Sequence, residues 1–181
     1  MSKIIIFEGP DNVGKGTQIK KLLHGLINEP THVIHYSSIP GLSKEECINF
    51  SKILYDDMFQ LSYDAHSHNR NLIFDRAHLG EYVYGPIYRG YSGDYIFDIE
   101  EKWKKNIFWD SLYLFVFIDK PENLISREDG LSFSVELEKK KQEINNFKEA
   151  FDKSKIKKKF LLNIQGFSPK EVHDYIIQCL K

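Results

Sequence analysis

The feature that most constrains this 181-residue chain is a short apolar run that passes directly into a glycine-rich loop. The run from Ile4 to Phe7 is continuous and rich in β-branched residues, as expected of a central parallel strand buried on both faces. The loop is Gly9-Pro10-Asp11-Asn12-Val13-Gly14-Lys15-Gly16-Thr17, and apolar residues then recur at helical spacing from Ile19 to Ile27, before Pro30. This order of strand, loop and helix places backbone N–H groups and a helix N-terminus where they can hold phosphates.

The residue types in the loop suit a nucleotide phosphate site. Gly9 and Gly14 allow close backbone approach and positive φ, and Lys15 supplies a charge to the β- and γ-phosphates. The position after the lysine, where the general motif has a Mg²⁺-ligating hydroxyl, is Gly16, so either Thr17 contacts phosphate or metal, or the metal is held mainly through water. The alternative is a surface turn before a helix. The residues predicted to bind the phosphates of ATP are Gly9, Asn12, Val13, Gly14, Lys15, Gly16 and Thr17.

Composition sets the broad class. With 41% hydrophobic and 28% charged residues, the chain fits a single globular domain over residues 1–181. A formal net charge of −1 gives no basic field, which disfavours nucleic acid and an anionic membrane surface as partners. Cys47 and Cys179 have no metal or redox spacing, and the N-terminal apolar run is too short for a signal peptide or a membrane span. We therefore expect a cytoplasmic protein.

The remaining apolar pattern alternates strands with helices. Strands are predicted at residues 32–36, 72–74, 112–118 and 160–164, and helices from the cap Ser43 to Leu61, at 100–109, 121–127 and 136–152, and after Ser168-Pro169. This predicts an α/β fold, a five-stranded parallel sheet flanked by helices, with the ligand at the carboxyl ends of the strands. The lysine runs 139–141 and 157–159 alternate with acidic and apolar residues and predict solvated faces.

Several motifs resemble those of known kinases. Gly14-Lys15-Gly16-Thr17 resembles the loop of adenylate kinases, whereas Phe7-Glu8-Gly9-Pro10-Asp11 is similar to the start of thymidylate kinases, which have Glu-Gly-x-Asp there. The pair Asp75-Arg76 ends the third predicted strand, as the thymidylate kinase pattern requires, and Gly80 to Gly85 supplies small and aromatic residues behind it.

The resemblance covers most of the chain. It continues through Asp119-Lys120-Pro121 and Arg127, and Tyr84 to Arg89 is most similar to short, phage-encoded thymidylate or deoxynucleotide kinases. The resemblance implies a P-loop nucleoside monophosphate kinase fold with a short lid at approximately residues 127–137. It also implies ATP and Mg²⁺ as cofactors.

The resemblance and the chemistry of the side chains together suggest roles around the loop. In thymidylate kinases the loop aspartate contacts the 3′-hydroxyl of the acceptor, which implies this role for Asp11. The planar fork of Arg76 suits an acceptor phosphate, and Asp75 would hold the water shell of Mg²⁺ or take up the acceptor proton. The alternative is a structural Asp-Arg ion pair. The predicted catalytic residues are Lys15, Asp75, Arg76 and Arg127, and the predicted metal contacts, through water, are Thr17 and Asp75.

The lid departs from the family pattern. Arg127 is the only arginine in the lid region, with Gly130 as a hinge, and it would supply transition-state charge or stack on adenine; the alternative is a solvated cation at a helix end. Thymidylate kinases usually carry a further arginine in the phosphate loop or the lid, whereas this loop has Asn12. The source of the donor-side catalytic charge therefore stays open.

The acceptor side departs as well, which leaves the base open. The segment Tyr36 to Gly41 lacks the arginine that touches the acceptor phosphate in the family, and the helix after it offers no arginine before Arg70. Tyr84 lies under the acceptor sugar or in the core, and Arg89 replaces a missing charge or belongs to a loop packed by its own tyrosines. The predicted acceptor-binding residues are Asp11, Phe59, Arg76, Tyr84 and Arg89.

These features together predict an ATP-dependent kinase of a deoxynucleoside monophosphate, with dTMP to dTDP as the leading reaction. One alternative is a kinase of a nucleoside, a modified pyrimidine nucleotide or a hydroxymethylated base in DNA. Another is a P-loop ATPase or switch that lacks an acceptor pocket. The expected partners are small-molecule nucleotides. Members of the family are commonly homodimers, which makes a homodimer possible here, but the sequence shows no pairing surface and leaves the oligomeric state open.

Overall fold

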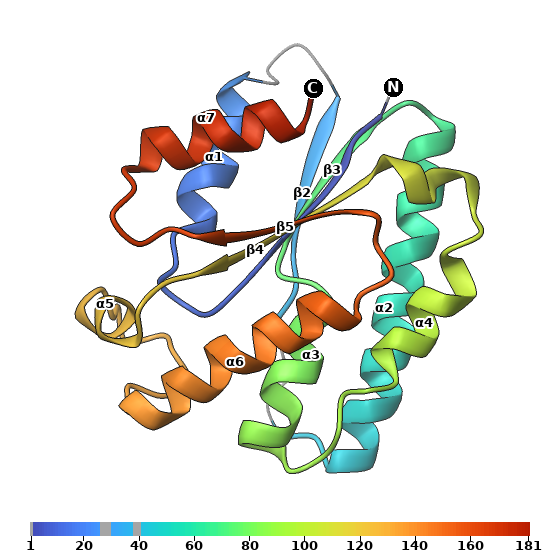
Figure 1. The fold of residues 1–181 in the computed structure, drawn as a ribbon. Helices are drawn as coiled ribbons and strands as arrows, with labels where there is room; N and C mark the ends of the chain where they lie inside the picture. The colour runs from blue at the N-terminus through green and yellow to red at the C-terminus, as the bar shows by residue number, and fades with distance from the viewer. Residues whose placement is uncertain (1, 26–29, 38–40) are drawn as a thin grey trace.

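A computed structural model describes residues 2–25, 30–37 and 41–181 and contains a sheet with helices on both faces (Figure 1). The sheet has five strands in the order β2-β3-β1-β4-β5, and every pair of neighbours is parallel. The predicted α/β fold is confirmed. The strands are β1 Ile4–Glu8, β2 Thr31–His35, β3 Asn71–Asp75, β4 Leu112–Ile118 and β5 Lys158–Asn163.

The sheet is built around β1. All five residues of β1 and all seven of β4 are buried, as expected of parallel strands covered on both faces. Because side chains alternate along a strand, Ile4 and Ile6 belong to one hydrophobic cluster, and Ile5 and Phe7 to the other. The parallel register brings the carboxyl ends of neighbouring strands to one edge of the sheet, where the loops that follow them meet.

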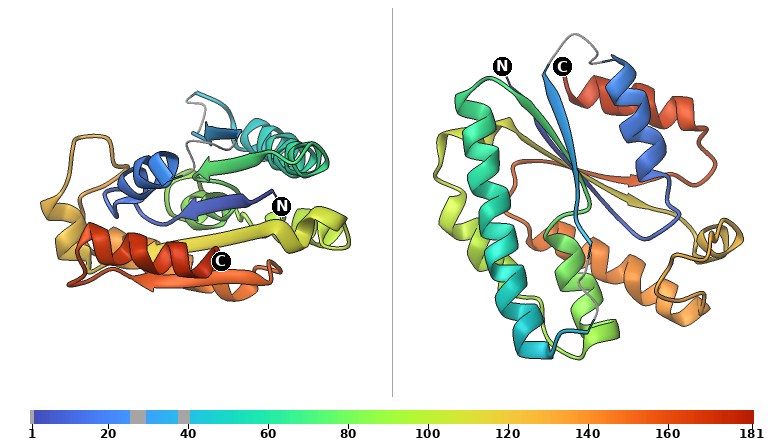
Figure 2. Two further views of the ribbon diagram at one scale, coloured as in Figure 1. Left: turned by 90° about the horizontal axis from the view of Figure 1, so that it is seen from above. Right: turned by 180° about the vertical axis from the view of Figure 1, so that it is seen from behind.

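The helices form two layers (Figure 2). One cluster joins the sheet to α1 and α7, and the other joins it to α2, α3, α4 and α6. Capping boxes at Ser43 and Ser168 begin α2 and α7, as the Ser-x-x-Glu pattern favours. The α-helices are α1 Lys15–Gly25, α2 Lys44–Ser67, α3 Leu79–Tyr84, α4 Ile96–Trp103, α5 Pro121–Ser126, α6 Leu137–Lys153 and α7 Pro169–Cys179; the π-helix η1 spans Gly85–Arg89 and the 3₁₀-helix η2 spans Ile107–Ser111.

Two predictions from the pattern need correction. The helix predicted at residues 100–109 is divided into α4 and η2, because the chain turns where the N–H of Asn106 donates to the carbonyl of Trp103. Lys140 is fully buried, although its run was predicted to be solvated, because it faces inward on α6 while Lys139 is partly exposed and Lys141 is exposed. Leu26 and Ile27, predicted in the first helix, and Ser38 to Pro40 lie outside the described residues.

Within residues 2–25, 30–37 and 41–181, no helix combines the length and apolar character needed to cross a membrane.

Candidate active site

The loop between β1 and α1 has the backbone that its glycines predicted. Gly9 has φ +133° and Gly14 has φ +90°, both in the region that side chains disfavour. A Cβ at Gly9 would lie 2.3 Å from the carbonyl oxygen of Phe117 in β4, so only glycine lets the loop leave the sheet at this point. Asn12 has φ +63°, a conformation that asparagine tolerates better than most residues.

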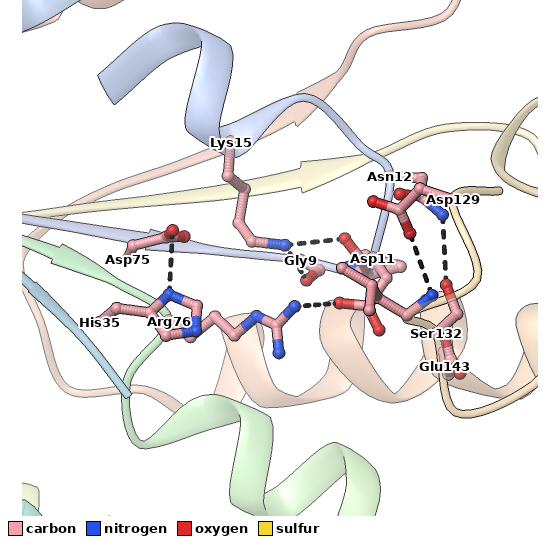
Figure 3. Close-up of polar contacts among 12 residues, drawn as sticks. Gly9, Asp11, Asn12, Lys15, His35, Asp75, Arg76, Asp129, Ser132 and Glu143 are labelled. Carbon is pink, nitrogen blue, oxygen red and sulfur yellow. Dashed lines mark hydrogen bonds and ion pairs between the residues drawn. The ribbon is translucent and has the colours of Figure 1, made fainter. Parts of the chain in front are cut away.

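Lys15 is buried at the start of α1, and its side chain bends back over the loop (Figure 3). Its Nζ atom donates to the carbonyls of Gly9 and Pro10, both at 2.8 Å. Burial, helped by the neighbouring charge of Arg76, lowers the pKa of Lys15 to about 8. The ammonium has no carboxylate within hydrogen-bonding distance in the described structure, so it is suited to receive an anion.

The end of β3 lies beside the loop because β3 pairs with β1, with Asp75 opposite Phe7. Arg76 has φ +67°, an uncommon conformation for arginine, and its N–H donates to the carbonyl of Phe7 at 2.9 Å. Its Nη2 atom lies 2.5 Å from Oδ1 of Asp11, a buried residue of the loop (Figure 3). Asp75 instead faces His35, whose Nδ1 lies 3.1 Å from Oδ2 of the carboxylate. The adjacent Asp75 and Arg76 therefore do not pair with each other.

Glu8 completes this junction and was not among the predicted site residues. Its side chain is buried, and Oε1 accepts hydrogen bonds from the N–H groups of Ala77 at 3.0 Å and Gly80 at 3.3 Å. Burial raises the pKa of this carboxyl group. Glu8 thus holds the turn that follows Arg76. The sequence signal was a carboxylate directly after four apolar strand residues.

A first pocket of about 310 Å³ opens between this junction and the helices α2 and α3. Three of the predicted acceptor residues, Arg76, Tyr84 and Arg89, line it. The Tyr84 hydroxyl is buried and has no hydrogen-bond partner in the described part of the chain. Two side chains from the segment between α5 and α6, Leu131 and Phe133, also reach this pocket.

Phe59, predicted to contact the acceptor, lies elsewhere. Its side chain is fully buried and packs against His78, Trp103 and Trp109, with ring centroids 5.3 to 6.5 Å apart. The helical period of α2 turns Phe59 toward the core and leaves Phe50 and Leu54 to line the pocket. The acceptor role predicted for Phe59 is therefore wrong.

Arg89 is held at the pocket wall by a buried carboxylate. Its Nη1 atom donates to Oε2 of Glu81 at 2.5 Å, and the hydroxyls of Tyr91 and Tyr95 donate to Oε1 of Glu81 at 2.6 and 2.9 Å. The aromatic stretch after α3 is therefore ordered by Glu81 as well as by its own tyrosines. Glu81 was absent from the predicted residues.

A second pocket of about 390 Å³ lies on the other side of the loop. The predicted residues Asn12, Val13, Gly14 and Thr17 line it together with Arg127. The remaining lining residues are mostly apolar and come from the start of α1, the end of β4, the connection after β5 and the start of α7: Gln18, Phe117, Ile164, Phe167, Pro169 and Val172. Such walls suit the flat face of a base.

The segment between α5 and α6, residues 127–136, contacts the loop directly. The Nδ2 atom of Asn12 donates to Oγ of Ser132 at 3.2 Å (Figure 3). It also donates to Oε2 of Glu128 at 3.1 Å. Arg127 pairs with the buried carboxylate of Asp119, which follows β4. The hydrogen bond from Ser132 contributes most to lowering the pKa of Glu128 to about 2. The predicted lid therefore meets the phosphate loop through Asn12.

Lys140 adds a buried cation beneath this segment. Its Nζ atom lies 3.1 Å from Oε2 of Glu143, and Oε1 of Glu143 accepts from the Tyr88 hydroxyl at 2.5 Å. The ring of Tyr88 stacks on Phe133 with centroids 5.1 Å apart. Through Tyr88 and Phe133, the Lys140–Glu143 ion pair connects α6 to the wall of the first pocket.

The residues near the loop fit Mg²⁺ through oxygen donors. Asp75 presents a carboxylate that is 23% exposed, and Thr17 presents an exposed hydroxyl on the first turn of α1. Mg²⁺ prefers oxygen ligands and keeps several waters, so a few protein oxygens suffice. In the described residues no group of three or more His, Cys, Asp or Glu side chains could by itself hold a metal ion.

Comparisons with known proteins support the fold. The chain matches no family model and no curated protein sequence. Over 97% of its length, its structure is similar to the YorR protein of Bacillus subtilis, solved in complex with phosphorylated GDP (TM-score 0.67, 22% identity, 94% of that chain). Over 98% of its length, the structure is also similar to the thymidylate kinase of Candida albicans (TM-score 0.70, 16% identity, 90% of that chain). The chain therefore shares the fold of these two proteins.

The contact between Gly9 and Phe117 can be tested by substitution. Gly9→Ala should lower the free energy of unfolding by about 3 kcal/mol, because the new methyl group meets a backbone carbonyl and φ is strained. Gly25→Ala is the control, since Gly25 ends α1 with open space around it and should change stability by less than about 1 kcal/mol. Equal urea midpoints for the two variants would contradict this reading.

Burial of Lys15 predicts a pH dependence of stability. Its pKa is about 8 in the folded chain and 10.5 as the reference, so between these values the unfolded chain binds more protons and stability rises with pH. The wild type should gain about 3 kcal/mol relative to Lys15→Met from pH 8 to 10.5. Urea denaturation across this range measures the difference, with Lys20→Met, an exposed position on the same helix, as control. Parallel pH curves for wild type and Lys15→Met would refute the prediction.

Proposed function

We propose that this protein is an ATP-dependent kinase of deoxynucleoside monophosphates, with dTMP to dTDP as the leading reaction. The observation that carries the proposal is the position of the phosphate loop between two pockets. Gly9 lines the first pocket together with Arg76, and residues 12–14 of the same loop line the second together with Arg127. A donor and an acceptor bound in these two pockets would meet at the loop.

The donor side follows from the second pocket. The apolar walls near Phe117 and Phe167 would take the base of ATP, and the loop N–H groups with Lys15 would hold its phosphates. Arg127, which is 41% exposed beside Asp119, would stack on adenine or move toward the γ-phosphate. Mg²⁺, held by Asp75 and Thr17 mainly through water, would neutralise charge on the β- and γ-phosphates.

The acceptor side follows from the first pocket. A monophosphate carries nearly two negative charges near neutral pH, and Arg76 would hold it beside Lys15. Asp11 would face the sugar 3′-hydroxyl and Tyr84 the sugar ring, as the resemblance to thymidylate kinases implies. The unpartnered, buried Tyr84 hydroxyl is consistent with a ligand in this position. The thymidylate kinase fold of the similar structure from Candida albicans further supports dTMP as the leading acceptor.

Transfer would then depend on position and charge. An oxygen of the acceptor phosphate attacks the γ-phosphorus, the bond from that phosphorus to the bridging oxygen of ADP breaks, and the products are ADP and a nucleoside diphosphate. Because the attacking phosphate is largely a dianion near neutral pH, the step requires little proton removal, which leaves Asp75 for the metal's water shell. Lys15, Arg76 and Arg127 would neutralise the charge that develops.

ADP release in the presence of different acceptors tests this function. With ATP and Mg²⁺, deoxynucleoside monophosphates should stimulate ADP formation at least about 100-fold over the rate with water alone, given the usual span of enzymatic acceleration. Nucleosides and hydroxymethylated DNA are tested as acceptors in separate assays. If only one of these two stimulates ADP release, the protein is a kinase of that acceptor instead. A rate that no acceptor changes would leave an ATPase or switch and reject the kinase.

The role of Arg76 can be separated from that of the donor site. Arg76→Ala should weaken acceptor binding roughly 10- to 100-fold, which is the usual value of hydrogen bonds to a charged group, and leave ATP affinity within about threefold. Arg70→Ala, an exposed arginine outside both pockets, is the matched control. Calorimetric titration with each nucleotide gives both affinities. Equal losses for ATP and acceptor would remove Arg76 from the acceptor site.

A further inference from the structure

The wall of the first pocket carries a buried acidic residue that no role in phosphate transfer requires. Glu81 is 2% exposed, and its two carboxylate oxygens collect three donors, Arg89, Tyr91 and Tyr95. The Nη1 atom of Arg89 lies a further 3.2 Å from the Tyr91 hydroxyl. A buried carboxylate is stable only when it is paired in this way, so the cluster is a built feature of the wall.

The cluster fixes one side of the Arg89 guanidinium and leaves the other free. Nη1 donates hydrogen bonds to Glu81 and Tyr91, while Nη2 and Nε make none with the described residues. The side chain is 20% exposed and lines the pocket. Arginine has five N–H donors and no acceptor, so the free edge presents donors only, in a planar arrangement.

Arg89 and Arg76 line the same pocket but have different partners. Arg76 lies beside the loop, bonded to Asp11. Arg89 lies beside the N-terminal half of α2, since the neighbouring Gly90 lies against the ammonium of Lys44. The pocket lining also includes the apolar residues Leu42, Phe50 and Leu54. A monophosphate held at Arg76 would leave Arg89 available to the base.

We propose that Arg89, positioned by Glu81, selects acceptors whose base has a carbonyl at pyrimidine C4 or purine C6, namely thymine, uracil or guanine, over cytosine and adenine, which have an amino group at that position. This inference rests on the proposed function and names the substrate class of its acceptor site. A donor-only guanidinium edge pairs with a carbonyl oxygen, and with the adjacent ring nitrogen in guanine, whereas an amino group at the same position brings two donors together. A good pair of this kind discriminates roughly 10- to 100-fold between bases.

Five acceptors, dTMP, dUMP, dGMP, dCMP and dAMP, measured by ADP release and by calorimetric titration, test the inference. In the wild type, kcat/KM and affinity should favour the three carbonyl bases by roughly 10- to 100-fold. Arg89→Gln, which has both a donor and an acceptor, should remove most of this preference. The loss should lie in KM for dTMP rather than in kcat, because Arg89 contacts the base and not the transferring phosphoryl group.

Three further variants test the base selection even if Arg89→Gln folds poorly. Arg89→Lys keeps a charge beside Glu81 but lacks the planar fork, and Tyr91→Phe removes one donor to Glu81 without changing charge; both should reduce the preference. Arg70→Gln, a matched exposed arginine, should not. Thermal unfolding of each variant separates a folding defect from a change in selectivity.

The results distinguish this inference from the proposed function. If Arg89→Gln weakens all five acceptors equally, Arg89 holds the phosphate or sugar that they share, and the base selection is overturned while the kinase stands. If no acceptor is phosphorylated but titration shows a carbonyl preference that Arg89→Gln removes, the selection stands and the kinase falls. A wild type that binds the five acceptors equally, or binds none, overturns the inference.

Discussion

The buried ammonium of Lys15 is the interaction on which the rest of the site depends. Removing a charge from water is unfavourable unless a partner compensates for it, and here the partners are two loop carbonyls rather than a carboxylate. Arg76, which is close enough to lower the pKa of Lys15, adds a second positive charge, and its own partner is Asp11. The protein therefore gathers charges of both signs at the carboxyl end of β1, and Lys15, which has no directly bonded carboxylate in the described structure, would pair with an entering phosphate.

The sheet holds these charged groups in place because it fixes the backbone around them. Gly9 passes against the carbonyl of Phe117, and Glu8 holds the turn after β3 through the N–H groups of Ala77 and Gly80. These contacts come from the three central strands, whose residues are nearly all buried. Arg76 is kept in its uncommon left-handed conformation by the same contacts. Strain at a ligand site persists only where the surroundings determine the backbone in this way.

The sequence was informative where function depends on local pattern. The apolar run, the glycine spacing and the Asp-Arg pair predicted the phosphate loop and the strand ends, because each is written in consecutive residues. It was uninformative where function depends on burial. Glu8 and Glu81 are ordinary acidic residues in sequence, and only the tertiary structure shows that they are buried and bonded. The acceptor-binding role predicted for Phe59 was wrong for the same reason, because an aromatic residue on an amphipathic helix can face the core as well as a pocket. Lys140 lies in a run of three lysines, and the sequence does not show that this one faces the core.

The π-helix η1 explains how an arginine eight residues after Glu81 comes to face it. In a regular α-helix, eight residues are about 2.2 turns, which would place the two side chains roughly 80° apart around the axis. The five residues of η1 form a wider turn, with hydrogen bonds that span five residues, and this turns Arg89 back toward Glu81. Such turns are frequent at functional sites. The proposed phosphate chemistry would thus lie at the ends of β1 and β3, while the residues proposed to read the base lie on α3 and η1. Because the two are separate, the acceptor could change by substitutions in α3 and η1 without disturbing the buried charges at the loop.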